Sequence, residues 1–83
     1  MDARFVYVYM LQSIDPHGHW YVGMTENLSE RLKAHNARRV PHTSKFGSWR
    51  IEIAVAFRDK TKAVAFEKYL KSQSARAFAK RHF

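Results

Sequence analysis

The chain contains no cysteine among its 83 residues. This absence excludes a disulfide framework, a thiolate zinc site and a cysteine nucleophile. It also fits a reducing compartment, so we expect a cytoplasmic protein. The longest strongly apolar run, residues 5–11, is far shorter than the ~20 residues that a membrane helix needs, and no signal-peptide pattern opens the chain. The sequence therefore predicts a soluble protein with no membrane partner.

Acidic residues are also scarce. Seven Asp and Glu stand against fifteen Lys and Arg, which gives a formal net charge of +8 and a pI near 10.2. An excess of this size in a small protein favours an anionic polymer, and hence nucleic acid, as the partner. A basic surface that is merely solvated is the alternative. The basic residues are scattered along the chain, and no strongly amphipathic basic helix points to a membrane surface.

The length and composition predict one domain spanning residues 1–83, because a chain of this size falls below the usual size of two domains. Hydrophobic residues make up 46% of the chain and aromatic residues 14%, which is more than a disordered chain carries. Residues 4–12 are apolar on both alternating faces and predict a central strand. A turn at 15–18 and a second strand at 19–24 then give an antiparallel pair, and the alternating segment 49–57 predicts a third strand.

Helix signals occur at two further places. Asn27 and Glu30 have the spacing of an N-cap and capping box, which predicts a helix from residue 28 to about 35 or 37. A second helix is expected over 61–73, with Asp59 or Thr61 as its cap, and a short third one over 75–81. The order ββαβαα predicts an α+β fold, in which a small three-stranded antiparallel β-sheet is flanked by helices.

Two charged residues lie where a plain core would not place them. On a helical wheel of about 100° per residue, Arg31 borders the apolar face of the first helix and Glu67 borders that of the second. An unpaired charge is unfavourable beside a packed face. Arg31 could instead extend along the sheet edge, Glu67 could be an ordinary boundary carboxylate, or the two could form an ion pair.

Tyrosines and a histidine accompany these charges. Tyr7 and Tyr9 lie on one face of the first strand, Tyr21 lies on the second strand, and His35 follows Arg31 by one helical turn. Each of them alone is more often a packing residue. Read together with a carboxylate and a guanidinium on a basic protein, they suit phosphodiester hydrolysis, in which Mg²⁺ binds one or two carboxylates plus phosphate oxygens. We therefore expect Tyr9, Tyr21, Arg31 and Glu67 to line one concave surface. A structure that placed Glu67 on the opposite sheet face from Tyr21 would overturn the nuclease reading.

These residues fall into three ordered blocks. The blocks are Tyr7-Val8-Tyr9, then Tyr21-Val22-Gly23 followed by Asn27-Leu28 and Arg31-Leu32 with His35-Asn36, and finally Ala63, Glu67 and Lys71 at four-residue intervals. Over residues 5–73 this pattern resembles the GIY-YIG nuclease superfamily in its small stand-alone bacterial type, similar to the N-terminal nuclease domain of excision-repair endonucleases. One departure is Tyr7, which replaces the glycine that opens the first half-motif.

The resemblance implies roles for individual residues. Glu67 would be the metal ligand for one Mg²⁺ or Mn²⁺ ion, and Arg31 would contact the scissile phosphate. Tyr9 or Tyr21 would position or deprotonate the attacking water, with His35 assisting in proton handling. The residues expected to contact nucleic acid are Tyr7, Arg38, Arg39, Lys45 and Lys71.

The function predicted from these observations is that of a metal-dependent endonuclease acting on nucleic acid, most readily DNA, in a process such as DNA repair. A non-catalytic nucleic-acid-binding module of the same fold is the alternative, and a small basic structural or ribosome-associated protein is a third. Larger family members carry a separate DNA-binding domain. Since none is visible here, specificity could come from a homodimer or a partner protein.

Overall fold

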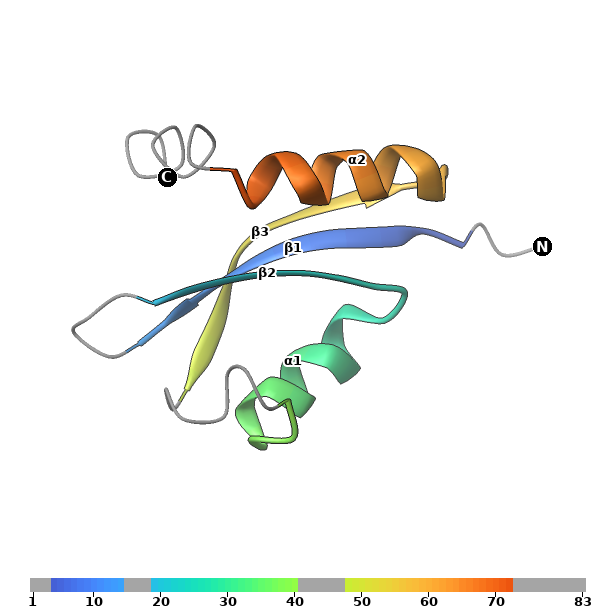
Figure 1. Cartoon of the computed structure of the whole chain (residues 1–83). Coiled ribbons are helices and arrows are strands. Elements are labelled where there is room, and N and C mark those ends of the chain that lie inside the picture. Colours follow the sequence, from blue (N-terminus) through green and yellow to red (C-terminus); the bar gives the residue numbers. More distant parts are fainter. Residues whose placement is uncertain (1–3, 15–18, 41–47, 73–83) are drawn as a thin grey trace.

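A computed structural model of the chain describes residues 4–14, 19–40 and 48–72 (Figure 1). Its elements follow in the order β1 (Val6–Ser13), β2 (Trp20–Thr25), α1 (Leu28–Asn36), β3 (Trp49–Phe57) and α2 (Lys60–Leu70). The α+β fold predicted from the sequence is confirmed, with each strand and both long helices within a few residues of the expected positions. The expected third helix at 75–81 lies outside the described residues.

The three strands form one antiparallel sheet in the order β2-β1-β3, so β1 is the central strand. Tyr9 pairs with Gly23 of β2 on one side and with Ala54 of β3 on the other. The register shifts between Met10 and Leu11, where β3 carries an irregularity. Tyr9 therefore lies in the middle of the sheet, between two neighbours with little or no side chain.

Alternate residues of β1 pack into two separate clusters, as expected for a strand buried on both faces. Val8 and Met10 pack with Ala63 and Leu70 of α2. The other face holds Tyr9, Leu11 and Trp49, with Tyr21, Leu28, Leu32 and Ile51 packed against them. Figure 1 shows the result, with α1 and α2 on opposite faces of the sheet.

The ends of α1 are set by its flanking residues. Asn27 is the N-cap, and its side-chain oxygen accepts a hydrogen bond of 3.1 Å from the backbone N–H of Glu30. After the helix, the N–H of Arg38 donates to the carbonyl of His35 at 3.1 Å, and the N–H of Arg39 donates to that of Ala34 at 2.9 Å. This is a Schellman motif, and Arg38 takes its left-handed position with a φ of 61°.

The start of β3 is attached to the end of α1 by one side chain. The Asn36 carboxamide accepts from the Trp49 N–H at 2.6 Å and donates to the Trp49 carbonyl at 3.2 Å. The α2 helix begins at the N-cap Asp59, whose carboxylate accepts from the Thr61 N–H at 2.8 Å. It ends at Leu70, three residues before the expected end at residue 73. Among the described residues, no helix has the length and apolar character needed to cross a membrane.

Candidate active site

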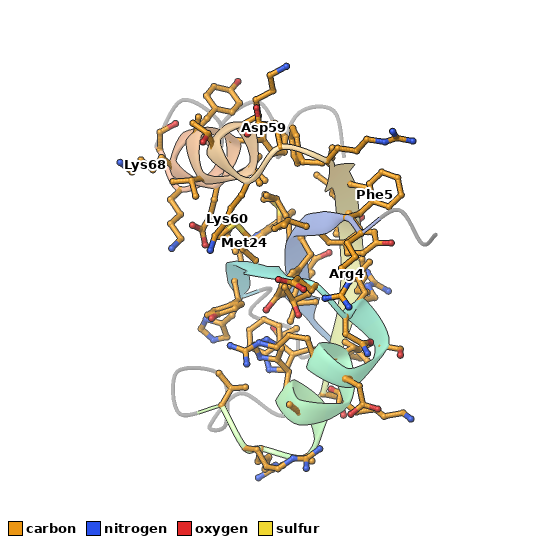
Figure 2. All side chains as sticks on the ribbon, turned by 90° about the vertical axis from the view of Figure 1, so that its right-hand side faces the viewer. Arg4, Phe5, Met24, Asp59, Lys60 and Lys68 are labelled. Carbon is orange, nitrogen blue, oxygen red and sulfur yellow. The ribbon has the colours of Figure 1, made fainter. Side chains whose placement is uncertain are left out.

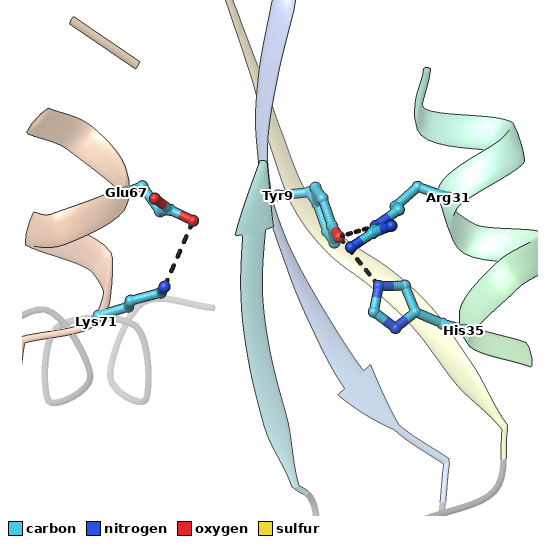
Figure 3. Close-up of polar contacts among 5 residues, drawn as sticks. All are labelled: Tyr9, Arg31, His35, Glu67 and Lys71. Carbon is cyan, nitrogen blue, oxygen red and sulfur yellow. Dashed lines mark hydrogen bonds and ion pairs between the residues drawn. The ribbon is translucent and has the colours of Figure 1, made fainter. Parts of the chain in front are cut away.

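The hydroxyl group of Tyr9 is the centre of a polar cluster on the α1 face of the sheet. Tyr9 is only 1% exposed, because it sits on the central strand beneath α1. Its hydroxyl accepts a hydrogen bond from Nε of Arg31 at 3.3 Å and lies 3.0 Å from Nε2 of His35 (Figure 3). A chain of three polar groups thus runs from the exposed surface to a histidine with no exposed area.

Both partners of Tyr9 come from α1 because they are four residues apart, and such residues lie on one side of a helix. Leu28 and Leu32 hold this side of α1 against the sheet. His35, nearer the end of the helix, is fully buried, whereas Arg31 is exposed. The sequence prediction that Arg31 borders the buried face is confirmed. His35, which alone would be a half-buried packing residue, is instead a buried hydrogen-bonding group.

The protonation states follow from burial and from the guanidinium charge. Burial, reinforced by the positive charge of Arg31, lowers the pKa of His35 to about 4. His35 is therefore neutral at pH 7, and the hydrogen bond between its Nε2 and the Tyr9 hydroxyl joins two uncharged groups. Burial also raises the pKa of Tyr9 despite the opposing hydrogen bond from Arg31, so Tyr9 stays a phenol. The hydrogen bond with Tyr9 raises the pKa of Arg31.

Tyr21 completes the cluster from the edge strand β2. Its ring packs edge-on against His35 with centroids 4.8 Å apart, and it lies 6.3 Å from the ring of Tyr9. Gly23 makes this packing possible, because a Cβ there would overlap the Tyr9 hydroxyl and lie 2.6 Å from Cζ of Tyr9. The group that approaches the Gly23 backbone is thus the ring of Tyr9. Tyr21 is only partly buried, so it is more accessible than Tyr9.

Glu67 lies apart from these four residues. It belongs to α2, which packs on the opposite face of the sheet, and its carboxylate pairs with Lys71 at 3.5 Å. Figure 3 shows this ion pair on one side of β2 and the Tyr9, Arg31 and His35 group on the other. The negative charge of Glu67 is nevertheless a small contributor, after burial, to the raised pKa of Tyr9. The two groups are therefore within electrostatic range across the edge of the sheet.

The prediction that Glu67 would share one concave surface with the tyrosines and Arg31 is wrong, because α2 and with it Glu67 pack on the sheet face opposite Tyr21. This placement counts against a nuclease site built on one sheet face. The physical reason is that a helical wheel locates Glu67 at the border of the apolar stripe of α2 but does not say which sheet face α2 covers. A substrate could contact both Glu67 and the cluster around Tyr9 only by passing around β2. Since β2 is the edge strand, no further strand of the described sheet separates them, and Gly23 leaves its backbone without a side chain.

The candidate site offers a divalent ion one carboxylate, that of Glu67. Within the described residues no group of three or more His, Asp or Glu side chains comes together, so a metal cage built by protein alone is not formed there. Mg²⁺ is commonly held by one or two carboxylates, waters and substrate phosphate oxygens. Glu67, with a side chain 20% exposed, can supply one such carboxylate once the ammonium of Lys71 moves away.

The remaining predicted contact residues lie on two parts of the surface. Tyr7 is partly buried on the same face as Tyr9, and Arg38 and Arg39 are exposed at the end of α1. Lys71 is exposed but paired with Glu67. Lys45 lies outside the described residues. Asn36 stands in the second sequence block without an assigned role, and the structure shows it joining α1 to β3. Its position at a helix end, where Asn often hydrogen-bonds backbone, is a signal for such a contact.

A family model described as the GIY-YIG catalytic domain matches residues 5–81. The chain belongs to the GIY-YIG family. The resemblance read from the three sequence blocks is thus confirmed at the level of the family. No solved structure shows a significant match.

Curated relatives of this GIY-YIG domain come from trypanosomatid parasites. A "structure-specific endonuclease subunit SLX1 homolog" of Leishmania infantum is 42% identical over 74 residues, which cover 81% of the chain, and one of Leishmania major is 38% identical over the same length. A homolog of Trypanosoma cruzi (strain CL Brener) is 42% identical over 52 residues, or 60% of the chain. The matched segment spans only 9–10% of these proteins. These relatives are thus described as homologs of a structure-specific endonuclease subunit, and the expected similarity to excision-repair nucleases of bacterial type is not supported.

Proposed function

We propose that this GIY-YIG domain is a divalent-metal-dependent endonuclease that hydrolyses phosphodiester bonds in DNA. The observation that carries the proposal is the chain of hydrogen bonds from exposed Arg31 through buried Tyr9 to buried His35. An arginine that is merely solvated on a basic surface does not require a buried tyrosine and histidine to orient its guanidinium. A guanidinium fixed by a phenol that is itself fixed by a neutral histidine is suited to hold one phosphate in one orientation.

Arg31 would stabilise the charge that develops on the phosphate in the transition state. Its Nε–H group is engaged by Tyr9, while the exposed end of the guanidinium carries the donors that can meet phosphate oxygens. Because the side chain is already oriented, little conformational entropy is lost when the phosphate binds. Interactions that are stronger in the transition state than in the ground state are the ones that raise the rate.

The two motif tyrosines would have different roles. Tyr9 is buried, its pKa is raised, and its hydroxyl is already hydrogen-bonded to Arg31 and His35, so it is poorly placed to accept a proton from a water molecule. We assign it the positioning of Arg31. Tyr21 is partly exposed beside the same cluster, and we assign it contact with the attacking water or the substrate.

Glu67 would hold the Mg²⁺ or Mn²⁺ ion, which as a Lewis acid supplies polarisation of the phosphate and stabilisation of the leaving oxygen. Its placement across β2 implies that the scissile phosphate lies over the edge of the sheet near Gly23, between Arg31 and Glu67. Lys71 would exchange its pairing with Glu67 for a contact with the nucleic-acid backbone, as its charge and exposure allow.

For the substrate class, the relatives' description as structure-specific endonuclease subunits favours branched DNA over a particular base sequence. The word "subunit" in those names also favours a partner protein, while a homodimer would serve the same need. We further propose a role in DNA repair, and the absence of cysteine fits a reducing compartment such as the cytoplasm. The alternative, a nucleic-acid-binding module without catalysis, predicts the same affinity for DNA but no use for Glu67.

A cleavage panel tests the proposal. Plasmid, linear duplex, splayed-arm and four-way-junction DNA are incubated with the protein and Mg²⁺ or Mn²⁺, beside Glu67→Ala, Arg31→Ala and the control Tyr69→Ala. We expect cutting of branched DNA by the wild type and the control, and loss by ~10²–10³-fold for Arg31→Ala. Undiminished cutting by Glu67→Ala overturns the assignment of the metal ligand. DNA binding without any cutting supports the non-catalytic module.

A further inference from the structure

Among the described residues, no helix covers one end of the α1 face of the sheet. The apolar residues around Leu11, Trp49 and Ile51 are covered by α1. Toward the other end of the strands, Ala54 and Ala56 of β3 are exposed although they lie on this same face, paired with Tyr9 and Tyr7. This end of the sheet lies next to the candidate active site, because Ala54 is paired with Tyr9 itself.

An open pocket of about 300 Å³ lies at this end, lined by Arg4, Phe5, Tyr7 and Glu26. The rings of Phe5 and Tyr7 are 6.4 Å apart and tilted by 50°. The guanidinium carbon of Arg58 lies 5.6 Å from the centroid of Phe5. Figure 2 shows Arg4 and Phe5 close together between the end of β3 and the start of α1. Two aromatic rings are thus framed by two arginines and one carboxylate.

The pocket has a defined position relative to the reaction centre. Tyr7 precedes Tyr9 by two residues on β1, so both side chains point to the same face about 6.6 Å apart along the strand. That distance is close to one nucleotide step along an extended single strand. A strand whose phosphate is held by Arg31 would bring its neighbouring nucleotide to the pocket.

We propose that this pocket binds one unpaired base next to the scissile phosphate, by stacking on Tyr7. The proposal rests on the nuclease function above and names the feature of the substrate that this site recognises. Single-stranded bases commonly stack on aromatic side chains displayed by an open sheet face, whereas bases within a duplex are already covered by their neighbours. The pocket therefore selects DNA that has an unpaired nucleotide at the cut.

The charges around the rings fix the orientation of the bound nucleotide. Arg4 and Arg58 attract the sugar-phosphate backbone, so the backbone passes on their side. Glu26 is exposed at the pocket wall and repels phosphate, but its carboxylate accepts hydrogen bonds from the N–H groups of a base. A peptide would be an alternative occupant, but the net charge of +8 and the nearby Arg31 favour nucleic acid.

The test uses 2-aminopurine, whose fluorescence falls when it stacks. The probe is placed at the first unpaired position of a splayed-arm DNA and, separately, inside a matched duplex, and the protein is titrated in EDTA so that no cleavage occurs. We expect wild type and Tyr7→Phe to quench the splayed probe, and Tyr7→Leu, which keeps apolar bulk without a ring, not to do so. Tyr69→Ala, a matched change at an exposed tyrosine of α2, should quench as wild type does.

Affinity separates the possible outcomes. Tyr7→Ala and Tyr7→Leu should weaken binding to splayed DNA by about 5- to 100-fold, with a clearly smaller loss on duplex. Equal losses on both DNAs, or full quenching by Tyr7→Leu, overturn the pocket while leaving the nuclease proposal intact. If the wild type neither binds nor cuts any DNA, the proposed function fails and the pocket proposal with it. Displacement of the bound splayed-arm DNA by an acidic peptide, but not by single-stranded DNA, also overturns the pocket.

Discussion

The hydroxyl of Tyr9 lies 3.0 Å from Nε2 of His35, at a place where the side chains have 1% and 0% of their surfaces exposed. Bulk water therefore does not reach the two groups, and each depends on the other for this hydrogen bond. The hydrogen bond joins the central strand to the last turn of α1 and also orients the tyrosine toward Arg31. One buried pair thus connects the packing of the fold to the position of the proposed phosphate ligand.

This pair predicts a stability that depends on pH. The pKa of His35 is about 4 in the folded protein and near 6.5 in the unfolded chain, because burial and the charge of Arg31 disfavour the protonated ring. Between these values the unfolded state binds more protons, so the contribution of His35 is fully present above pH 6.5 and is lost as the pH falls toward 4. We expect a loss of up to about 3 kcal/mol in the free energy of unfolding, measured by urea denaturation at several pH values.

The control for this measurement is His35→Gln, in which the extra slope between pH 6.5 and 4 should disappear. His19→Gln should keep it, because His35 is still present. The rings of Tyr9 and Tyr21 face the imidazole, and the charge that lowers its pKa is that of Arg31. A wild-type slope equal to that of His35→Gln would show that His35 is not buried as described.

Gly23 gives a second prediction. Because a Cβ at this position meets both the hydroxyl and Cζ of Tyr9, Gly23→Ala should displace the ring and lower the free energy of unfolding by about 1–3 kcal/mol. The displaced hydroxyl should also release Arg31 and reduce cleavage. In a double-mutant cycle with Tyr9→Leu, which lacks those two atoms, most of the penalty should vanish. A penalty that stays unchanged in that background would place the clash elsewhere.

The strands and helix starts were predictable because their signals are local. Alternation along β1 separates Val8 and Met10 from Tyr9 and Leu11, and the two core clusters divide in the same way. Asn27 and Asp59 cap the helices as their residue types suggest. Arg31 and His35 were placed on one side of α1 by their four-residue spacing alone.

The placement of Glu67 was not predictable in the same way. Which face of the sheet a helix covers depends on the path of the connections, and periodicity within α2 carries no information on it. The pocket beside Tyr7 was missed for a related reason. It exists because α1 leaves part of its face uncovered and exposes Ala54 and Ala56, a fact of packing that no single segment encodes.

Lys71 provides a third prediction, about metal binding. Its ammonium lies 3.5 Å from the carboxylate of Glu67, where it competes with a divalent cation. Exposed pairs of this kind contribute at most about 1 kcal/mol, so Lys71→Met should tighten Mn²⁺ binding by about 2- to 5-fold. The measurement is a titration of free Mn²⁺ by electron paramagnetic resonance. Lys68→Met is the matched control on the same helix, and Glu67→Gln should abolish the site. Equal affinities in wild type and Glu67→Gln would contradict the assignment.

The last prediction concerns Arg38. It occupies the left-handed position of the Schellman motif, with a φ of 61°, where glycine is the usual residue because a Cβ is unfavourable there. A glycine would relieve this backbone strain, so the presence of an arginine at the position suggests that its side chain has a function. Arg38→Gly should therefore raise the free energy of unfolding, by up to about 1 kcal/mol, and yet weaken DNA binding. If Arg38 contacts one phosphate, the slope of log affinity against log salt should become less negative by about 0.9.

Arg39→Gly removes the same charge one residue later, where the backbone is not left-handed, and should give no gain in stability. A gain in stability with unchanged DNA affinity and slope would show that Arg38 has no role in binding.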